Sequence, residues 1–388
     1  MDAAIIGWAH TRFGKLENDT VETMIGQVAE DALDHAAIDA DQVDAVFVGT
    51  FNGGFSPQSF VSTLASLRLN ALRHKPATRF ENACATGSAA IHGALNALEA
   101  RRIKTALVIG VEKMTSLPTA HVGDVLLKAS YQPEESDTEG GFAGVFGQIA
   151  AAYFQQYGDR SEALARIAAK NHANGAHNPL AHIQKDLGFD FCAHVSDKNP
   201  YVAGPLKRTD CSLISDGAAA LVISNLDQAW HADRAIGFRA TSHVSDYMPL
   251  SRRSITELTG ARLAWQQAME TSRLSLDDLS FVETHDCFTI AELMEYEAMG
   301  LAKRGEGARV IEEGITEIDG SLPVNPSGGL KSKGHPVGAT GVSMHVMAAK
   351  QLVGDTAGAK VADARTAGIF NMGGTAVANY VSILERLR

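Results

Sequence analysis

Apolar runs alternate with amphipathic segments along the first hundred residues of the chain. Uninterrupted apolar runs are typical of buried strands, whereas apolar residues at helical spacing are typical of helices that pack on a sheet. The runs predict strands at 3–8, 43–48, 78–80 and 106–111. The segments between them predict helices at 21–32, 61–69 and 87–100. Asp19 and Glu22 have the spacing of a capping box at the start of the first helix.

The second half of the chain repeats this order of elements. Its pattern predicts strands at 235–242 and 279–284 and helices at 254–271 and 291–300. Two short matches accompany the repeat: the tripeptide at 85–87 recurs at 339–341, and the strand at 105–109 resembles 366–370. Matches of this length also arise by chance between units of similar composition. Because both occur in the same order and structural setting, we favour an internal duplication.

Strand–helix alternation predicts an α/β fold with mostly parallel sheets and helices on both faces. We expect two halves, residues 1–235 and 236–388, whose loops share a crevice that holds the site. Residues 114–210 depart from the pattern and are rich in glycine, histidine, asparagine and acidic residues. They predict an insertion in the first half, a lid or ligand platform with helical pieces at 148–157 and 162–172.

Composition and charge exclude several classes of protein. The net charge of −11 over 388 residues argues against a general nucleic-acid binder. The four cysteines have no paired or metal-like spacing, which predicts a reducing compartment and therefore a soluble, cytoplasmic protein. Apolar stretches stay short of the ~18 residues that a membrane span needs. Four histidines of the insertion fit no tetrahedral metal set, so we expect no metal: His172, His177, His182 and His194.

Cys84 is the first candidate for chemistry. It lies between the predicted strand at 78–80 and the predicted helix at 87–100. A thiol at a helix N-terminus faces unpaired N–H groups and the positive end of the helix dipole, which favour the reactive thiolate. A lone cysteine is more often a small buried residue, so the prediction depends on the other loops that meet Cys84.

Three further loops contain candidate groups. His285 and Cys287 follow the strand at 279–284, although Asp286 as a helix cap with Cys287 packed inside is an equal alternative. The loop at 325–341 has five glycines and two prolines around His335, which favours a functional loop. Glycines at 371–375 leave N–H groups that can face an oxyanion, or else form only a hairpin turn.

At this point the chain resembles the thiolases, and within them the sterol-carrier-protein-2 type. The resemblance extends over essentially the whole chain. Five motifs carry it: Cys84-Ala85-Thr86-Gly87, Asp216-Gly217-Ala218-Ala219-Ala220, His285-Asp286-Cys287-Phe288, Asn325-Pro326-Ser327-Gly328-Gly329 and Gly334-His335-Pro336. The family implies two βαβαβαββ halves in a five-layer αβαβα arrangement, working as a homodimer or homotetramer on coenzyme A (CoA) thioesters.

The resemblance also implies roles for the candidate residues. Cys84 would form the acyl-enzyme, and the backbone N–H groups of Cys84 and Gly373 would hold its oxyanion. Most thiolases have a second catalytic cysteine where this chain has Asn371, so Cys287 would replace it as acid and base. His335, with His285 or a water it holds, would stabilise the enolate of the second thioester.

Substrate, partners and alternatives follow from the same resemblance. We expect CoA thioesters as substrates in lipid metabolism, no tightly bound cofactor, and in some relatives a small OB-fold partner protein. Four basic residues are candidate CoA contacts at the rim of the site: Lys207, Arg208, Lys331 and Lys333. The leading activity is 3-ketoacyl-CoA thiolysis or the reverse condensation by an acetyl-CoA acetyltransferase. The alternatives are a biosynthetic acyltransferase with another acceptor and a non-catalytic thioester-binding subunit.

Overall fold

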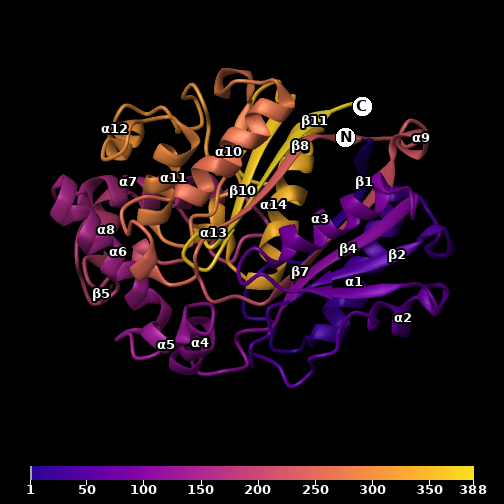
Figure 1. Ribbon diagram of the computed structural model, residues 1–388, viewed down its shortest axis with the longest axis horizontal. Helices are drawn as coiled ribbons and strands as arrows, with labels where there is room; N and C mark the ends of the chain where they lie inside the picture. Colours follow the sequence, from indigo (N-terminus) through magenta and orange to yellow (C-terminus); the bar gives the residue numbers. More distant parts are fainter. Residues whose placement is uncertain (1) are drawn as a thin grey trace.

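A nine-stranded sheet organises the chain in the computed structural model, which describes residues 2–388 (Figure 1). Its strands are β1 (Ala3–His10), β2 (Ala45–Gly49), β3 (Ala77–Phe80), β4 (Thr105–Glu112), β7 (Gly217–Asn225), β8 (Ile236–Ser245), β9 (Phe281–Glu283), β10 (Thr366–Gly373) and β11 (Ala378–Arg386). Across the sheet their order is β3-β2-β4-β7-β1-β8-β11-β10-β9. The strands predicted from apolar runs are confirmed to within a few residues.

The two halves of the sheet share one strand order. Outward from the middle, the first half has β1-β7-β4-β2-β3 and the second has β8-β11-β10-β9. The second half lacks a full fifth strand, and a single bridge between Val282 and Val324 stands in its place. Only two residue pairs join β1 to β8 where the halves meet. The predicted boundary at residue 235 falls between β7 and β8, and residue 1 lies outside the described residues.

The sheet is mixed, and the prediction of a mostly parallel sheet is wrong. Only β2–β3, β2–β4 and β9–β10 are parallel. The five other pairs are antiparallel. The reason is that each half ends with an antiparallel pair of strands, β4 with β7 across the insertion and β10 with β11 across four residues. The last strand of each half inserts between the first strand and the strand before it, and runs opposite to both.

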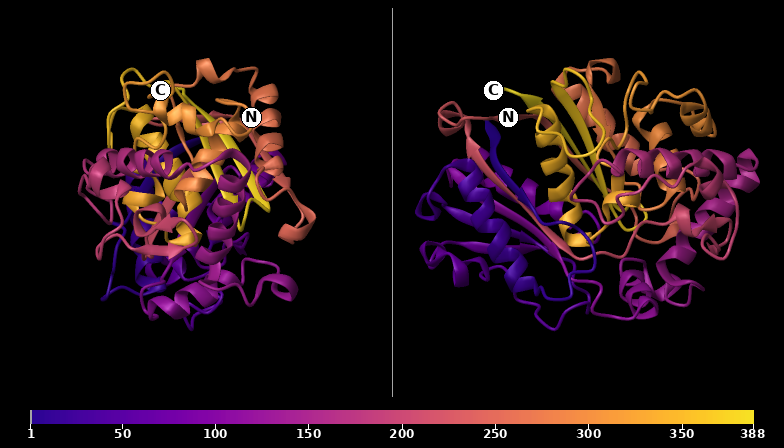
Figure 2. Two further views of the ribbon diagram at one scale, coloured as in Figure 1. Left: turned by 90° about the vertical axis from the view of Figure 1, so that its left-hand side faces the viewer. Right: turned by 180° about the vertical axis from the view of Figure 1, so that it is seen from behind.

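Helices complete five layers. The main ones are α1 (Val21–Ala36), α3 (Thr86–Glu99), α10 (Thr259–Ser272), α11 (Thr289–Met299) and α14 (Val337–Leu352). Helix α1 packs on the outer face of the first half and α10 on that of the second, while α3 and α14 lie between the halves (Figure 2). Because α14 contacts strands of both halves, nearly all of its residues are buried, and an apolar surface on every side suits that position.

The predicted start of α1 needs a correction. The capping box is formed by Thr20 and Thr23, which exchange backbone-to-side-chain hydrogen bonds of 2.9 and 3.1 Å. Asp19 and Glu22 do not form it because the helix begins at Val21, which makes Thr20 the N-cap. The two threonine hydroxyls accept from the backbone N–H groups of Thr20 and Thr23, as in a capping box.

The insertion forms a helical layer beside the sheet. It comprises α4 (Thr119–Leu127), α5 (Gln132–Glu135), α6 (Gly141–Tyr157), α7 (Ser161–Gly175), α8 (Phe189–Ala193) and the hairpin β5 (Tyr201–Ala203) to β6 (Leu206–Lys207). Figure 1 shows these helices along one side of the molecule. The helical pieces predicted at 148–157 and 162–172 are confirmed as parts of α6 and α7.

Four short helices complete the chain: α2 (Ala65–Arg68), α9 (Leu226–Ala229), α12 (Gly307–Glu312) and α13 (Gly329–Lys333). The helix predicted at 61–69 is therefore mostly wrong. Its first residues form a turn, and Leu69 leaves the helical region with φ −112° and ψ 85°. Among residues 2–388, no helix has both the length and the apolar character that crossing a membrane demands.

Substituting Gly341 with alanine should destabilise the protein by about 1–3 kcal/mol, because the backbones of α3 and α14 are in contact there and leave no room for a methyl group. The N-terminal turns of α3 and α14 touch through Gly87 and Gly341, and a Cβ at Gly341 would fall on the backbone N of Ser88. A lower midpoint of thermal unfolding would show the effect. Gly123→Ala in α4 is the control, since no atom lies within 4 Å of its added Cβ. Equal midpoints for the two variants would contradict the prediction.

Candidate active site

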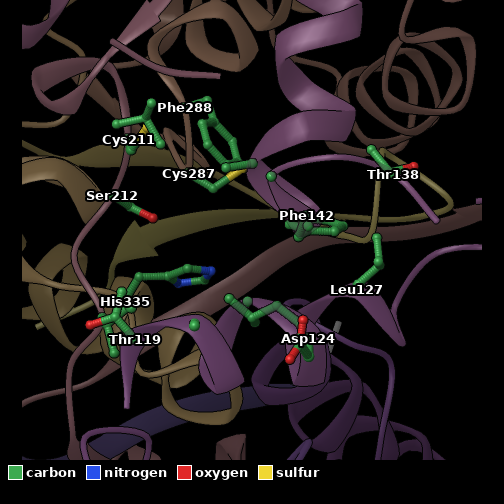
Figure 3. A pocket seen from close by; sticks show the side chains of 18 of the residues that line it. Thr119, Asp124, Leu127, Thr138, Phe142, Cys211, Ser212, Cys287, Phe288 and His335 are labelled. Atoms are coloured by element: carbon green, nitrogen blue, oxygen red, sulfur yellow. The ribbon is translucent and has the colours of Figure 1, made fainter. Parts of the chain in front are cut away.

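Three of the four loops singled out in the sequence, those of Cys84, Cys287 and His335, meet at one cavity of about 680 Å³. Cys84 precedes α3, Cys287 precedes α11, and His335 lies between α13 and α14. All three line the cavity, and Figure 3 shows the Cys287 and His335 side chains projecting into it. The Cys84 sulfur and one ring nitrogen each of His285 and His335 lie within 4.8 Å of one another. The structure thus brings together the residues that the sequence singled out as candidates for catalysis.

The Cys84 thiol is not the depressed-pKa group that its position predicted. Its side chain is 4% exposed, and burial raises the pKa of the Cys84 thiol to about 12. Hydrogen bonding from the backbone N–H of Gly374 opposes the rise, and the charge of Glu112 adds to it. Helix α3 begins only at Thr86, so its N–H groups do not outweigh burial. Cys84 is therefore a neutral thiol that needs a proton acceptor before it can react.

His335 is placed to be that acceptor. Its Nδ1 lies 2.7 Å from Thr340 Oγ1, and the Thr340 hydroxyl donates to the Pro336 carbonyl at 3.0 Å. The hydroxyl oxygen can then accept from Nδ1, which leaves Nε2 unprotonated, and Nε2 has no protein partner. Burial lowers the pKa of His335 to about 3, with a contribution from Lys333. The ring is therefore neutral and can take a proton from Cys84.

His285 and Cys287 complete a cluster with Cys84 and His335. The rings of His285 and His335 are nearly perpendicular, with centroids 5.1 Å apart. Burial holds the pKa of His285 well below its usual range. Burial, with the nearby Cys84, raises the pKa of the Cys287 thiol well above its usual range. Both groups are therefore neutral in the free protein.

Asp286 holds the glycine-rich loop and does not cap α11. It accepts hydrogen bonds from the backbone N–H of Leu330 at 2.6 Å and of Lys331 at 3.1 Å, and from Asn171 at 2.8 Å. A Cβ at Gly329 would strike its carboxyl group. The N-cap of α11 has no side-chain hydrogen bond, so the alternative that Asp286 caps this helix is wrong. Asp286 instead joins the loop of His285 to that of His335.

Gly373 lies against the Cys84 loop, where a Cβ would strike the Asn82 carbonyl. The N–H that approaches the Cys84 sulfur belongs to its neighbour, Gly374. Arg253 holds this loop by donating to the Thr375 carbonyl and hydroxyl, both at 2.6 Å. The role of the Gly373 N–H in an oxyanion hole remains a prediction.

The predicted basic rim is wrong for three of its four residues. Lys207, Lys331 and Lys333 are each at most 2% exposed, so they cannot meet a ligand at the surface. Lys207 pairs with Asp210 at 3.3 Å, and Lys331 donates to the Cys211 carbonyl. Sequence alone does not separate a loop lysine from a buried one. Arg208 is exposed, and its contact with CoA remains a prediction.

Acidic residues stand where cations were expected. Among the described residues that line the cavity, none is lysine or arginine, whereas Asp124 and Asp137 are present. The inner wall is apolar, with Met114, Phe142 and Phe288 among its residues, and Phe288 stacks on Phe146 at 4.3 Å. The cavity therefore suits an apolar group near the thiols. Any cations that bind a polyanionic ligand must lie outside its lining.

Cys84, His285 and His335 are also the one group of described side chains close enough to hold a metal. A histidine that binds a metal normally donates its second ring N–H to an acceptor. His335 meets that condition through Thr340, but His285 Nδ1 lies 2.9 Å from the amide nitrogen of Asn371, which is a donor. The set therefore suits proton transfer better than it suits a zinc ion.

Alkylation of Cys84 by iodoacetamide should accelerate about tenfold per pH unit from pH 7 to 9, because a thiol with so high a pKa gains thiolate throughout that range. Peptide mass analysis of the Cys84 adduct would give the rates. Glutathione is the reference, since its curve should flatten near a thiol pKa of about 8.5. A plateau for Cys84 below pH 8 would instead show a preformed thiolate.

Comparison with known proteins adds family relationships. The family description "Thiolase, N-terminal domain" matches residues 3–187, and "Thiolase C-terminal domain-like" matches residues 241–386. The acetyl-CoA acetyltransferase of Methanothermobacter thermautotrophicus is 34% identical over 99% of this chain and 100% of its own length. Sterol carrier protein 2 of Bos taurus is 29% identical over 95% of this chain and 69% of its own length.

Two solved structures share the fold over the whole chain. The structure described as Ltp2-ChsH2(DUF35) aldolase has a TM-score of 0.83 at 22% identity and is covered over 98% of its length. Human mitochondrial 3-ketoacyl-CoA thiolase in complex with CoA has a TM-score of 0.75 at 17% identity, again over 98% of its length.

Proposed function

We infer that Cys84 carries the acyl group in this chain, which belongs to the thiolase family and is a thiolase-type acyltransferase. One observation carries the inference: a buried thiol lies within 4.8 Å of ring nitrogens of two neutral histidines at a cavity of about 680 Å³. The substrates are CoA thioesters, as the name of the archaeal relative indicates for that protein.

In the first half-reaction, the Cys84 sulfur attacks the thioester carbonyl of an acyl-CoA. The Cys84 proton passes to His335 Nε2, and the same proton then goes to the sulfur of the departing CoA. One carbon–sulfur bond forms and one breaks, so no other reactant is needed. The N–H groups of Cys84 and Gly373 stabilise the oxyanion.

In the second half-reaction, Cys287 moves a proton at the α-carbon of the second thioester. For thiolytic cleavage, the neutral thiol is the form required, because the enolate that departs must be protonated; its raised pKa keeps it in that form. For condensation, Cys287 first gives its thiol proton to His335 Nε2, which is bare again once CoA has left. The Cys287 thiolate then accepts the α-proton, and His335 returns its proton to the Cys84 sulfur when the acyl group leaves. His285, and His335 while its Nε2 holds the transferred proton, stabilise the enolate oxygen in both directions.

The surroundings of the cavity support further assignments. The phosphates of CoA bind outside the lining residues, at Arg208 or at cations from another chain, because the lining itself carries only acidic charge. A small OB-fold partner protein is one source of such cations, and the aldolase structure that shares this fold is described with a DUF35 component. We also propose a cytoplasmic homodimer or homotetramer that acts in lipid metabolism.

Intact-mass measurement after incubation with acetyl-CoA tests the proposed function. Acetyl transfer to a cysteine adds about 42 Da. The adduct should form within the first turnover and disappear when free CoA is added. An unchanged mass with acetyl-CoA and with a panel of longer acyl-CoAs would favour a non-catalytic thioester-binding subunit. An adduct that CoA does not remove would favour an acyltransferase with another acceptor.

A further inference from the structure

Asn371 is a fully buried amide at the centre of the cluster. It lies on β10 and makes three hydrogen bonds. Its Nδ2 donates to the Cys84 carbonyl at 3.1 Å and lies 2.9 Å from His285 Nδ1, and its Oδ1 accepts from the Ser88 hydroxyl at 2.8 Å. The amide therefore contacts the loops of both the nucleophile and the second histidine.

The orientation of this amide is determined by its neighbours. The Cys84 carbonyl has no proton to donate, so the amide atom that faces it must be the NH₂ group. The same NH₂ group faces His285 Nδ1. A flipped amide would bring two oxygens together at Cys84 and would leave the buried carbonyl oxygen without a donor, which costs about 1–3 kcal/mol.

This orientation decides which nitrogen of His285 carries the proton. Because the NH₂ group is a donor, His285 Nδ1 must be the bare acceptor, and the single proton of the neutral ring then lies on Nε2. His285 Nε2 is buried and has no protein partner. It is thus a free donor in the same cluster in which His335 Nε2 is a free acceptor.

We propose that Asn371 is a positioning residue that fixes His285 as the Nε2–H tautomer, so that His285 gives a hydrogen bond to the enolate oxygen of the second thioester. The proposal rests on the proposed function for the identity of that oxygen. It assigns different tasks to two neutral histidines: His335 receives the Cys84 proton, and His285 stabilises negative charge without releasing a proton. The partners of their Nδ1 atoms, an amide NH₂ and a hydroxyl, produce the difference.

Nitrogen NMR on the unmodified protein tests the tautomer directly. Protein labelled with ¹⁵N-histidine gives long-range proton–nitrogen correlations that distinguish protonated from bare ring nitrogens, and His285→Gln identifies the signals of His285. We expect a protonated Nε2 and a bare Nδ1. A protonated Nδ1, or an imidazolium at pH 7, would overturn the proposal whether or not a variant of Asn371 folds.

Asn371→Asp tests the consequence for the reaction. A carboxylate at this position accepts from Nδ1–H and so removes the proton from Nε2 of the neutral ring. Exchange of the α-protons of acetyl-CoA with deuterated water should fall by about 10²-fold or more, the effect of losing one oxyanion donor. The acyl adduct on Cys84 should still form, with a smaller loss of rate, because the carboxylate no longer donates to the Cys84 carbonyl. Unchanged exchange, or equal loss of both half-reactions, would contradict the assignment.

Ser88→Ala is the matched control, because it removes the hydrogen bond from Ser88 and leaves the contacts of Asn371 with Cys84 and His285. It should retain both the wild-type tautomer and the exchange rate to within a few-fold. The two proposals fail separately. A protein that forms no acyl adduct but shows the Nε2–H tautomer contradicts the proposed function alone. A protein that forms the adduct with the other tautomer contradicts this inference alone.

Discussion

Replacing Cys84 with alanine should abolish the acyl adduct and lower turnover by at least about 10³-fold, because the acyl group then has no nucleophile to bind. The side chain is small and buried, and alanine omits only its sulfur atom, so the variant should fold. Intact mass after incubation with acetyl-CoA, together with a thiolysis assay, would measure both effects. A persisting adduct would show that another cavity cysteine, Cys211 or Cys287, carries the acyl group.

Cys192→Ala is the matched control for this experiment. Cys192 is as buried as Cys84 but packs against α7 and is not among the residues that line the cavity. Its alanine variant should form the adduct at the wild-type rate. Loss of the adduct in this variant would mean that general destabilisation, and not loss of the nucleophile, explains the Cys84 result.

Replacing Cys287 with alanine should separate the two half-reactions. Loss of a general acid and base costs about 10²–10⁴-fold, so exchange of the α-protons of acetyl-CoA with deuterated water should fall by that factor. The adduct on Cys84 should form as before, because its proton goes to His335. Mass spectrometry follows both quantities in one sample.

Cys211→Ala is the control for this second experiment. Cys211 also lines the cavity, and its backbone pairs with that of Phe288, next to Cys287. Its variant should retain α-proton exchange. If Cys287→Ala retains exchange and Cys211→Ala loses it, the acid and base is Cys211 and our assignment is wrong.

Most of the fold could be predicted from local patterns, because buried strands and packed helices leave a signature in a few consecutive residues. Strand direction could not. The chain between β4 and β7 exceeds a hundred residues, and nothing in it shows that β7 returns beside β1 and antiparallel to it. The helix at 61–69 was mostly wrong because its apolar residues, such as Val61 and Ala65, join a core cluster with residues of α1 and β1. Their apolar spacing reflects that packing, although only Ala65–Arg68 is helical.

The location of the site was predictable from its motifs, but the charge state of its groups was not. Helix N-termini favour thiolates, and only the structure shows that burial outweighs this at Cys84. The same holds for Lys331 and Lys333, which look like phosphate ligands in the sequence and are core residues in the fold. In the sequence, Asn371 is notable only because most thiolases have a cysteine at its position. Its hydrogen bonds to Ser88, Cys84 and His285 join residues that are 283, 287 and 86 positions away, and contacts of that kind have no sequence signature.

The glycine contact between α3 and α14 has a consequence for how rigid the reaction centre must be. Cys84 lies two residues before α3 and His335 two residues before α14, so the nucleophile and its proton acceptor each precede the central helix of one repeat. With Gly87 and Gly341 pressed backbone to backbone, neither helix can slide along the other without moving the sulfur relative to the imidazole. The contact therefore fixes the distance between the Cys84 sulfur and the His335 ring, over which the proton is transferred. It also makes the two repeats catalytically inseparable, since each holds one end of that path.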